Sequence, residues 1–462
     1  MSAGGARQDL APCAGLRLDR LAPAFSCLLC LLPLLLFWSR FANLYWFHDD
    51  WELTSQMQSL PFREWLVARY GENFSPVFNA AWYAAIRIGS GSYIAMILAV
   101  WATHLANLLL LAAILRHCGF AWQAQSIAVV TLGMAWSNIE TLGWAACWIS
   151  LLSILWFLFA WWLLLAASRR GSRYSTMMCS IAAVICALAS ALTFSRGVLS
   201  GVLLAFFVVL SRADSFTAAD QEPSNLPAFF PSFFPSLTRW QWPTGIALCC
   251  VTAVALIPYR WMLSGYHNFA DANGSELGAM ASYGVHYYLL SPLFHLLPIP
   301  HKTVALRELM IAGVCKALVV ACAIWLSKER ARALLWILLL LDLGMAVMLA
   351  LGRYRFDMET SVSYRYQYVS LLCFAPCFAV VVMKGLGLLR RTTARHVAFA
   401  VLFVGWALLL GYPWKRHSQR WSQWRGTEAR EALAAAQPEQ LFGLPTITAA
   451  RARELIRIYG LH

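Results

Sequence analysis

The sequence predicts an all-α polytopic membrane protein, on three observations. Hydrophobic residues make up 60% of the 462 residues, a fraction that soluble domains do not reach. Runs of about 18 or more apolar residues recur along the whole chain, which is the length that a helix needs to cross a bilayer. Lipid offers the backbone no hydrogen-bond partners, so a segment that crosses it must be a helix.

We place about eleven membrane spans on these apolar runs. In chain order they are residues 21–43, 93–115, 122–137, 142–167, 177–193, 196–210, 244–263, 309–326, 332–350, 367–386 and 395–412. They form one predicted bundle, residues 1–412, followed by a short helical tail, residues 413–462, with helices near 427–436 and 447–458. The basic N-terminus ahead of the first span is typical of a signal anchor that stays in place.

The net charge of +14 fits a membrane topology better than nucleic-acid binding, for which no motif is present. With the N-terminus inside, short basic loops face the cytoplasm, as the positive-inside rule requires, and so does the Pro- and Phe-rich linker 211–243. The longer loops 44–92, 264–308 and 352–366 then lie outside. The tail also lies outside by parity, although it opens with Lys415, Arg416, Arg420 and Arg425. Either the count is off by one, or the tail crosses despite its charge.

The stretch Phe47-His48-Asp49-Asp50-Trp51-Glu52 follows the first span and places three carboxylates and a histidine beside the membrane. Asp49 can cap a helix that has Glu52 at its third position. Pro61 would divide the segment from Trp51 to Tyr70 into two surface helices. Segment 76–88 is apolar but too short to cross, so we expect an interfacial or re-entrant helix.

Asp49 and Asp50 are candidate catalytic residues, and His48 is a candidate binding residue beside them. A carboxylate next to apolar surface has a raised pKa, which suits a base that takes a proton from an acceptor hydroxyl or amine. The alternative is the helix cap just described, and one acid can cap while the other faces a cleft. The pair alone leaves both interpretations open.

Arg365 stands at the outer end of a span, between Tyr364 and Tyr366. Its guanidinium can clamp a phosphate, with tyrosine hydroxyls beside it. Arginine and aromatics also anchor span ends, and for this motif alone that alternative is favoured. Glu140 and Arg196 lie in short outer turns, where they either line a central cavity or are solvated.

Asp342 lies near the middle of a span, and the sequence names no partner for it. An acid there is costly, so it is either functional or a neutral, hydrogen-bonded carboxyl. His104 and Asn107 share one helical face, a pattern more typical of hydrogen bonds between helices. The histidines of loop 264–308 lack metal-binding spacing, and most of the 13 Cys lie within spans, so neither a zinc site nor disulfides are indicated.

These residues in this order resemble the GT-C superfamily of polyprenyl-phosphate-sugar-dependent glycosyltransferases. The protein O-mannosyltransferase-like and lipid A aminoarabinose transferase-like branches are the most similar. The family's acidic pair after the first helix matches Asp49 and Asp50, and its late Arg-Tyr element matches Arg365 and Tyr366. Glu140 matches a glutamate ahead of a tryptophan. Two positions depart from the pattern: Asn73 stands where His or Arg is frequent, and Ser195-Arg196 replaces a charged turn.

The resemblance implies a GT-C-like bundle with surface helices in the first outer loop. It implies a sugar donor on a polyprenyl phosphate, with Asp49, or failing it Asp50, as base or acceptor-orienting group. Arg365, Tyr366 and Arg196 would stabilise the departing phosphate, and loop 264–308 would cover the site. The remaining substrate-binding candidates are Tyr364, Glu140, Asn73 and His48. A divalent metal cofactor stays open.

The implied acceptor is a glycan, lipid or protein, and the implied site faces the periplasm from a bacterial inner membrane. Two alternatives stay open. One is an O-antigen polymerase or ligase, whose chemistry lies in a large late loop. The other is a lipid-linked glycan transporter or flippase, which needs charges at mid-membrane, and Asp342 is its main candidate.

Overall fold

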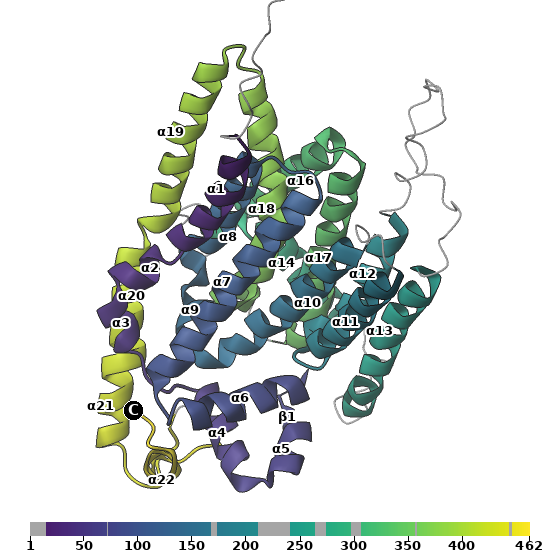
Figure 1. Cartoon of the computed structure of the whole chain (residues 1–462). Coiled ribbons are helices and arrows are strands. Elements are labelled where there is room, and N and C mark those ends of the chain that lie inside the picture. The colour runs from purple at the N-terminus through teal and green to yellow at the C-terminus, as the bar shows by residue number, and fades with distance from the viewer. Residues whose placement is uncertain are drawn as a thin grey trace, which may run out of the picture.

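The computed structural model describes residues 15–71, 73–167, 173–210, 241–263, 274–296, 306–355, 358–442 and 446–462. These residues are almost all helical, which confirms the predicted all-α membrane fold (Figure 1). The first 14 residues, most of the linker 211–243, and His267, Asp271 and His301 of the predicted loop 264–308 lie outside the described residues.

Seven helices among the described residues are long and apolar enough to cross a membrane. They are α7 (Tyr93–His117), the stretch Ala145–Ala167 with α10 (Trp148–Ala167), α11 (Arg173–Ala191), α16 (Leu306–Leu326), α17 (Glu329–Arg353), α18 (Tyr364–Gly387) and the run Thr392–Ala435, which starts with α19 (Thr392–Gly411). Three shorter apolar helices lie at Leu21–Leu36, Ser195–Leu210 and Trp242–Pro258. They belong to α1 (Gly15–Leu29) with α2 (Leu32–Leu36), to η3 (Ser195–Val198) with α12 (Leu199–Leu210), and to α13 (Gln241–Leu263).

Ten of the eleven predicted spans correspond to these helices, and the span predicted at 122–137 does not. There α8 (Trp122–Gly133) has 12 residues, which is about 18 Å and well short of the ~30 Å hydrocarbon core. It is buried from Ala124 onward and packs against α1, α7 and α18. The first predicted span is also interrupted, because α1 ends at Leu29 and α2 begins at Leu32. Pro33, in the first turn of α2, has no N–H and cannot continue the hydrogen bonding of α1.

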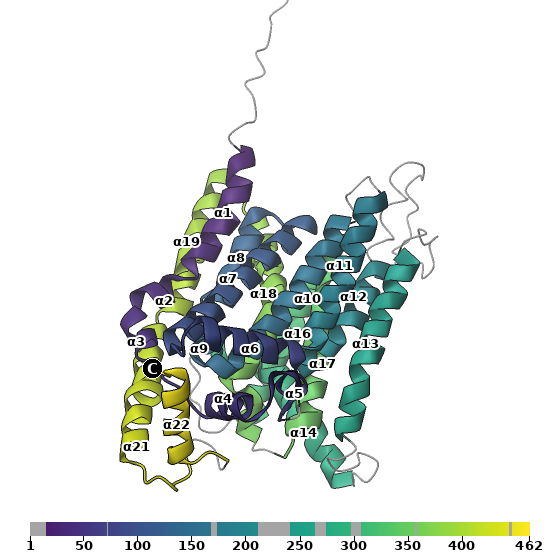
Figure 2. The same ribbon diagram turned by 60° about the horizontal axis from the view of Figure 1, so that its bottom comes forward.

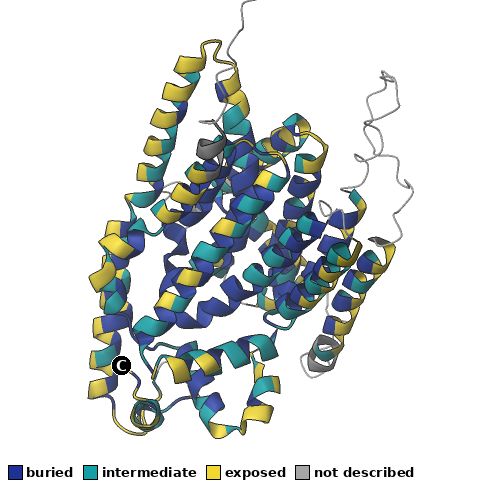
Figure 3. Cartoon of the chain, viewed as in Figure 1, coloured by how far each residue is buried: buried dark blue, intermediate teal, exposed yellow. Residues whose placement is uncertain are grey.

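Burial separates the centre of the bundle from its lipid-facing edge (Figure 3). The apolar stretch within Ala145–Ala167 is 72% buried, whereas the apolar stretch within the run that starts with α19 is only 17% buried. The exposed side chains of α19 include Val397, Val401, Val404 and Leu408. Apolar side chains on an outer helix are expected where the surroundings are lipid.

The first outer loop forms a layer of short helices across the ends of the spanning helices (Figures 1 and 2). Helix α4 (Asp49–Ser59) stops before Pro61 and α5 (Phe62–Val67) follows it, which confirms the predicted break. Strands β1 (Arg69–Tyr70) and β2 (Asn73–Phe74) pair antiparallel, and α6 (Pro76–Ile88) comes next. The predicted cap is wrong: His48 is the N-cap residue, with φ +43°, while Asp49 and Asp50 are already helical.

The described part of loop 264–308 is helical rather than irregular. Helix α14 (Gly274–Leu290) packs between α16 and α17, and the short α15 (Leu293–Leu296) follows it. Met280, Tyr283 and Tyr287 are buried at helical spacing, so one face of α14 belongs to the bundle. His286 on this helix forms a hydrogen bond between its Nδ1 and the Oγ of Ser361, 2.6 Å apart. Ser361 belongs to η5 (Met358–Val362).

The tail continues the last spanning helix instead of starting a separate one. After α19 come α20 (Trp414–Ser422), the π-helical turn η6 (Gln423–Glu428) and α21 (Ala429–Ala435), which corresponds to the helix predicted near 427–436 and follows η6 without a break. The second predicted helix is present as α22 (Ala449–Tyr459), which packs on α4. There Arg451 Nε donates to Ser55 Oγ at 3.0 Å. The basic tail therefore lies on the same side of the bundle as the first loop (Figure 1).

Asp342 on α17 forms a buried ion pair with Lys316 on α16. The Nζ and Oδ2 atoms are 2.5 Å apart, and both side chains are 3% exposed. Lys316 Nζ also donates to the Tyr288 carbonyl at 2.7 Å and lies 4.0 Å from the centre of that ring. The pair joins α14, α16 and α17, and a residue 26 positions away was not identifiable as its partner from the sequence.

Replacing Lys316 with Met should leave Asp342 buried without a counter-charge and lower the free energy of unfolding by about 3–5 kcal/mol. The double variant Lys316→Met/Asp342→Leu should regain most of that loss, because it leaves no buried charge. Denaturant or thermal unfolding of the purified protein measures both. Lys415→Met, at an exposed lysine, is the control and should change stability by less than about 0.5 kcal/mol. A double variant no more stable than Lys316→Met contradicts the pairing.

Candidate functional site

The candidate site lies where α4 begins and α18 begins, beside the turns that precede α10. Those turns are η1 (Trp136–Asn138), α9 (Ile139–Gly143) and η2 (Ala145–Cys147). The tail helix α20 packs on α9, so residues near the chain's end reach the same region. The site is therefore assembled from four distant parts of the chain.

Asp50 is completely buried and accepts three hydrogen bonds. Oδ1 accepts from the Ala146 N–H at 2.8 Å, and Oδ2 accepts from the Phe47 N–H at 3.1 Å and the Tyr93 hydroxyl at 3.2 Å. Burial raises the pKa of Asp50 to about 7, although these N–H groups and the charge of Arg425 oppose the shift. With both oxygens engaged, Asp50 fixes the surrounding backbone.

Asp49, the neighbouring residue, is half-buried and has access to solvent. The Tyr70 hydroxyl bonds to its carboxylate, and burial together with this charge raises the pKa of Tyr70 well above its usual value. The pKa of His48 is lowered by burial and by the charge of Arg425, against the opposite effect of Asp49. Of the acidic pair, Asp49 is the acid able to meet a substrate.

Glu140 is buried and holds the start of α18. Its Oε2 accepts from the Ser363 hydroxyl and from the Arg365 backbone N–H, each at 3.2 Å. A carboxylate at a helix N-terminus satisfies unpaired N–H groups and complements the helix dipole. Of the two alternatives for Glu140, the solvated turn is therefore excluded, and its contacts explain how the Arg365 backbone is placed.

Arg365 is half-buried, with its guanidinium 5.8 Å from the Trp144 ring centre and 5.2 Å from that of Tyr366. Its Nε is buried and has no hydrogen-bond partner among the described residues. It lies close enough to Asp49 and Glu140 to interact with their charges. Tyr364 packs edge-on against Trp136, with ring centres 5.3 Å apart.

Arg425 is a site residue that sequence analysis treated only as a basic tail residue. It is 4% exposed. Four rings surround its guanidinium at centroid distances of 3.6 Å (Phe47), 4.3 Å (Trp144), 4.4 Å (Trp421) and 4.7 Å (Trp424). Within the described part of the chain its Nε and Nη1 atoms have no hydrogen-bond partner. The available signal was the tryptophan-rich context of this arginine, Trp421-Ser422-Gln423-Trp424-Arg425.

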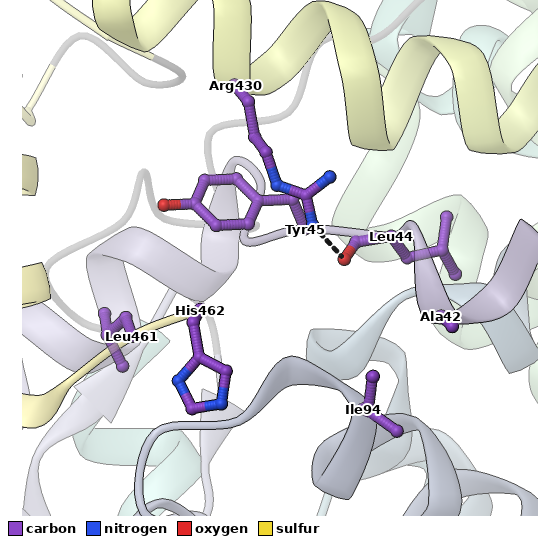
Figure 4. A pocket seen from close by; sticks show the side chains of 7 residues that line it. All are labelled: Ala42, Leu44, Tyr45, Ile94, Arg430, Leu461 and His462. Carbon is purple, nitrogen blue, oxygen red and sulfur yellow. Dashed lines mark hydrogen bonds between the residues drawn. The ribbon is translucent and has the colours of Figure 1, made fainter. Parts of the chain in front are cut away.

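A second arginine of the tail fastens this region to the first loop. Arg430 Nη1 donates to the Asn43 carbonyl at 3.1 Å and to its Oδ1 at 2.9 Å, and Nη2 donates to the Leu44 carbonyl at 3.4 Å. The guanidinium lies across Tyr45, and both line a cavity of about 440 Å³ (Figure 4). Two positive charges of the tail, Arg425 and Arg430, therefore bind the protein itself, whereas Lys415, Arg416 and Arg420 are exposed.

Arg196 is buried, so the alternative of a solvated turn is excluded here too. Its Nη2 donates to Ser150 Oγ at 2.9 Å, and the guanidinium lies 4.5 Å from the Phe194 ring centre. Nε and Nη1 have no partner in the part of the chain that the structure describes. It interacts electrostatically with Tyr366 and Cys147, and Cys147 in turn lies near Glu140, Arg365 and Arg425.

Asn73 has a structural role and pairs with Tyr70 in the small hairpin. Its Oδ1 accepts from the Ser195 N–H at 3.3 Å, which ties the small hairpin to η3. His104 Nδ1 contacts the Tyr368 hydroxyl at 3.0 Å, and Asn107 donates to the Leu151 carbonyl at 3.1 Å. Those two residues make the hydrogen bonds between helices that their spacing favours.

The structure therefore brings Asp49, Arg365 and Arg425 together, positioned by Asp50 and Glu140. Two guanidiniums with unpaired N–H groups next to a half-exposed carboxylate can bind an anion and move a proton. Among the described residues, no three His, Cys, Asp or Glu side chains are grouped to hold a metal ion.

Comparison with solved structures identifies the fold. The crystal structure of the Archaeoglobus fulgidus oligosaccharyltransferase in the apo form matches with a TM-score of 0.50 and 16% identity, over 96% of this chain and 59% of that one. The chain has the GT-C fold. The same enzyme tethered to an acceptor peptide with the NVT sequon matches with a TM-score of 0.48 and 14% identity, over 96% and 58%. This GT-C chain thus spans about three-fifths of the length of those structures.

No family model matches the sequence, and no curated protein matches it. The GT-C fold is consistent with the superfamily resemblance.

The buried Asp50 should make stability depend on pH. Because its pKa rises from 3.8 in an exposed chain to about 7 when folded, the folded protein holds a proton that the unfolded chain releases. Stability should therefore fall by about 4 kcal/mol as pH rises from about 4 to 7. Asp50→Asn cannot ionise, so the difference between its thermal unfolding curves and those of the wild type isolates this term. The same pH slope in both proteins contradicts the assignment.

Proposed function

We propose that this integral membrane protein is a glycosyltransferase that uses a sugar on a polyprenyl phosphate. The main support for this proposal is that Asp49, Arg365 and Arg425 lie close together at one end of the bundle. Such a group suits transfer from a lipid phosphate, which needs a base at the acceptor and positive charge at the leaving group. The GT-C fold supports the proposal.

In the proposed reaction, Asp49 takes the proton from an acceptor hydroxyl or amine while that atom bonds to the anomeric carbon of the sugar. The bond between this carbon and the phosphate oxygen breaks, and its electron pair stays on the lipid phosphate. Asp50 and Glu140 act as positioning residues, because their oxygens already bind the protein. His48, whose pKa is lowered by burial and by the charge of Arg425, lies beside the base.

Arg365 and Arg425 would hold the phosphate, and Arg196 would extend the cationic surface past Tyr366. Each guanidinium has unpaired N–H groups in a largely dry setting, where a bound anion is stabilised strongly. Tyr364 and Tyr366 pack around the start of α18 and shape this surface. Asn73 contributes by holding the first loop to η3.

The acceptor is a glycan, lipid or protein on the non-cytosolic face, which we take to be the periplasmic face of a bacterial inner membrane. The Archaeoglobus enzyme was crystallised with an acceptor peptide, which makes a protein acceptor one option. The sequence motifs favour the protein O-mannosyltransferase-like or aminoarabinose transferase-like branches.

An O-antigen polymerase or ligase remains the main alternative, because it performs related chemistry on the same face. A transporter has less support. Its main candidate is the mid-membrane acid Asp342, which forms a buried ion pair with Lys316 that joins neighbouring helices.

Asp49→Asn and Arg365→Gln should each reduce turnover ~100-fold or more, since each removes charge that acts in the transition state. Mass spectrometry of glycans and lipid A from a deletion strain first identifies the missing product. The same strain complemented with each variant then gives the rate at which the product returns. Glu52→Gln, one turn further along α4, is the control and should stay near wild type. Turnover within a few-fold of wild type in both Asp49→Asn and Asp50→Asn contradicts the proposal.

Arg425→Gln should raise the KM for the lipid-linked donor at least ~10-fold, because it removes a cation from the phosphate site. Arg425→Lys should recover part of the loss through its charge, although it lacks the planar contact with four rings. Arg416→Gln, at an exposed arginine of α20, is the control. If Arg425→Gln lowers thermal stability but leaves donor KM and kcat unchanged, Arg425 only anchors the tail.

A further inference from the structure

A second cavity lies at the opposite end of the bundle from Asp49. Its volume is about 1030 Å³, and it is bounded by the turn between α7 and α8, the turn between α16 and α17, and the end of α18. Lys384 in its wall lies 19 residues after Arg365 on α18, which corresponds to about 28 Å along a helix. The cavity is therefore separate from the candidate site, and its assignment does not depend on the proposed function.

Positive charge dominates the polar part of this cavity. Lys328, Arg330 and Lys384 line it with exposed side chains, whereas Arg332 is bound to carbonyls of the preceding turn. Glu329 is the one carboxylate in the lining. A site with three exposed cations that have no ion-pair partner among the described residues, and with one acid, favours an anionic ligand.

Two helices begin at the cavity. Helix α8 starts at Trp122 and α17 at Glu329, and neither N-cap residue makes a side-chain hydrogen bond. Helix N-termini present N–H groups and partial positive charge, a combination that binds phosphate groups. In addition, Ser327 is 7% exposed, lines the cavity, and carries a buried hydroxyl without a partner among the described residues. That hydroxyl is free to bond a phosphate oxygen.

The remaining walls are apolar and identify the source of the phosphate. Phe120, Leu326, Val380 and Met383 line the same cavity, and three of the elements around it are spanning helices. A free phosphate ion gains nothing from contact with apolar side chains. A phospholipid, in contrast, can place its phosphate among the cations and the first part of its acyl chains against the apolar wall. Basic pockets between membrane helices bind anionic headgroups in this way.

We propose that this cavity binds the headgroup of an anionic phospholipid. The phosphate contacts Ser327, Lys328 and Lys384 and the two helix N-termini, and the upper acyl chain lies against the apolar wall. Bound there, one lipid links the ends of α8, α17 and α18.

The test uses the full-length protein in nanodiscs of phosphatidylcholine with increasing phosphatidylglycerol. Thermal unfolding midpoints, plotted against phosphatidylglycerol content, give an apparent affinity. Lys328→Gln/Lys384→Gln should weaken that affinity about 30-fold. The matched control is Arg390→Gln/Arg391→Gln, which removes the same charge from exposed positions outside this cavity at the same end of the bundle. Glu329→Gln should act in the opposite direction and tighten binding.

Two results overturn the proposal. If the cavity variant and the control variant lose equal affinity, the lipid responds only to diffuse surface charge. If inorganic phosphate in pure phosphatidylcholine nanodiscs raises the unfolding midpoint as much as phosphatidylglycerol does, the ligand is a free phosphate. Ser327→Ala adds a neutral check, because it should weaken phosphatidylglycerol binding without changing any charge.

Discussion

The buried carboxylate of Asp50 is the contact on which the rest of the site depends. It joins the start of α4 to Tyr93 at the beginning of α7 and to the backbone of η2, three segments separated by up to 96 positions in the chain. Leaving those donors buried without an acceptor would cost about 1–3 kcal/mol each, so the arrangement is strongly specified. Asp49 is the residue directly before Asp50 in α4, so the same contacts fix its backbone and leave its half-buried side chain at the surface of the cluster.

Glu140 repeats this solution for the cationic side of the site. Its carboxylate binds the first turn of α18 and so fixes the position of the Arg365 backbone. The arginines themselves are treated differently, since Arg425 and Arg196 rest on aromatic rings and keep N–H groups unpaired. Rings stabilise a buried cation without using its donors. Asp50 and Glu140 thus bind groups of the protein itself, while the cations keep capacity for a ligand.

The sequence predicted the helical class, most spans and the break at Pro61, because those features follow from local composition and from proline's missing N–H. It also selected Asp49, Glu140 and Arg365 as site residues, because one predicted membrane topology places all three on the same side of the membrane. It failed where a long-range contact decides the outcome. Lys316 could not be paired with Asp342, and Asp50 could not be separated from Asp49, since each depends on which distant groups a side chain meets. Arg425 was missed for the same reason, and α8 was assigned as a span because hydropathy does not report where a helix stops.

The docking of the tail has a consequence for how the protein matures. Arg425 enters its cage of rings only after the last spanning helix has been inserted, because two of the four rings, Trp421 and Trp424, come from the tail itself and the other two, Phe47 and Trp144, precede it by hundreds of residues. A growing chain on the ribosome therefore carries its acids long before it carries this cation. Under the proposed function, the phosphate site is therefore complete only once the tail has docked against the first loop.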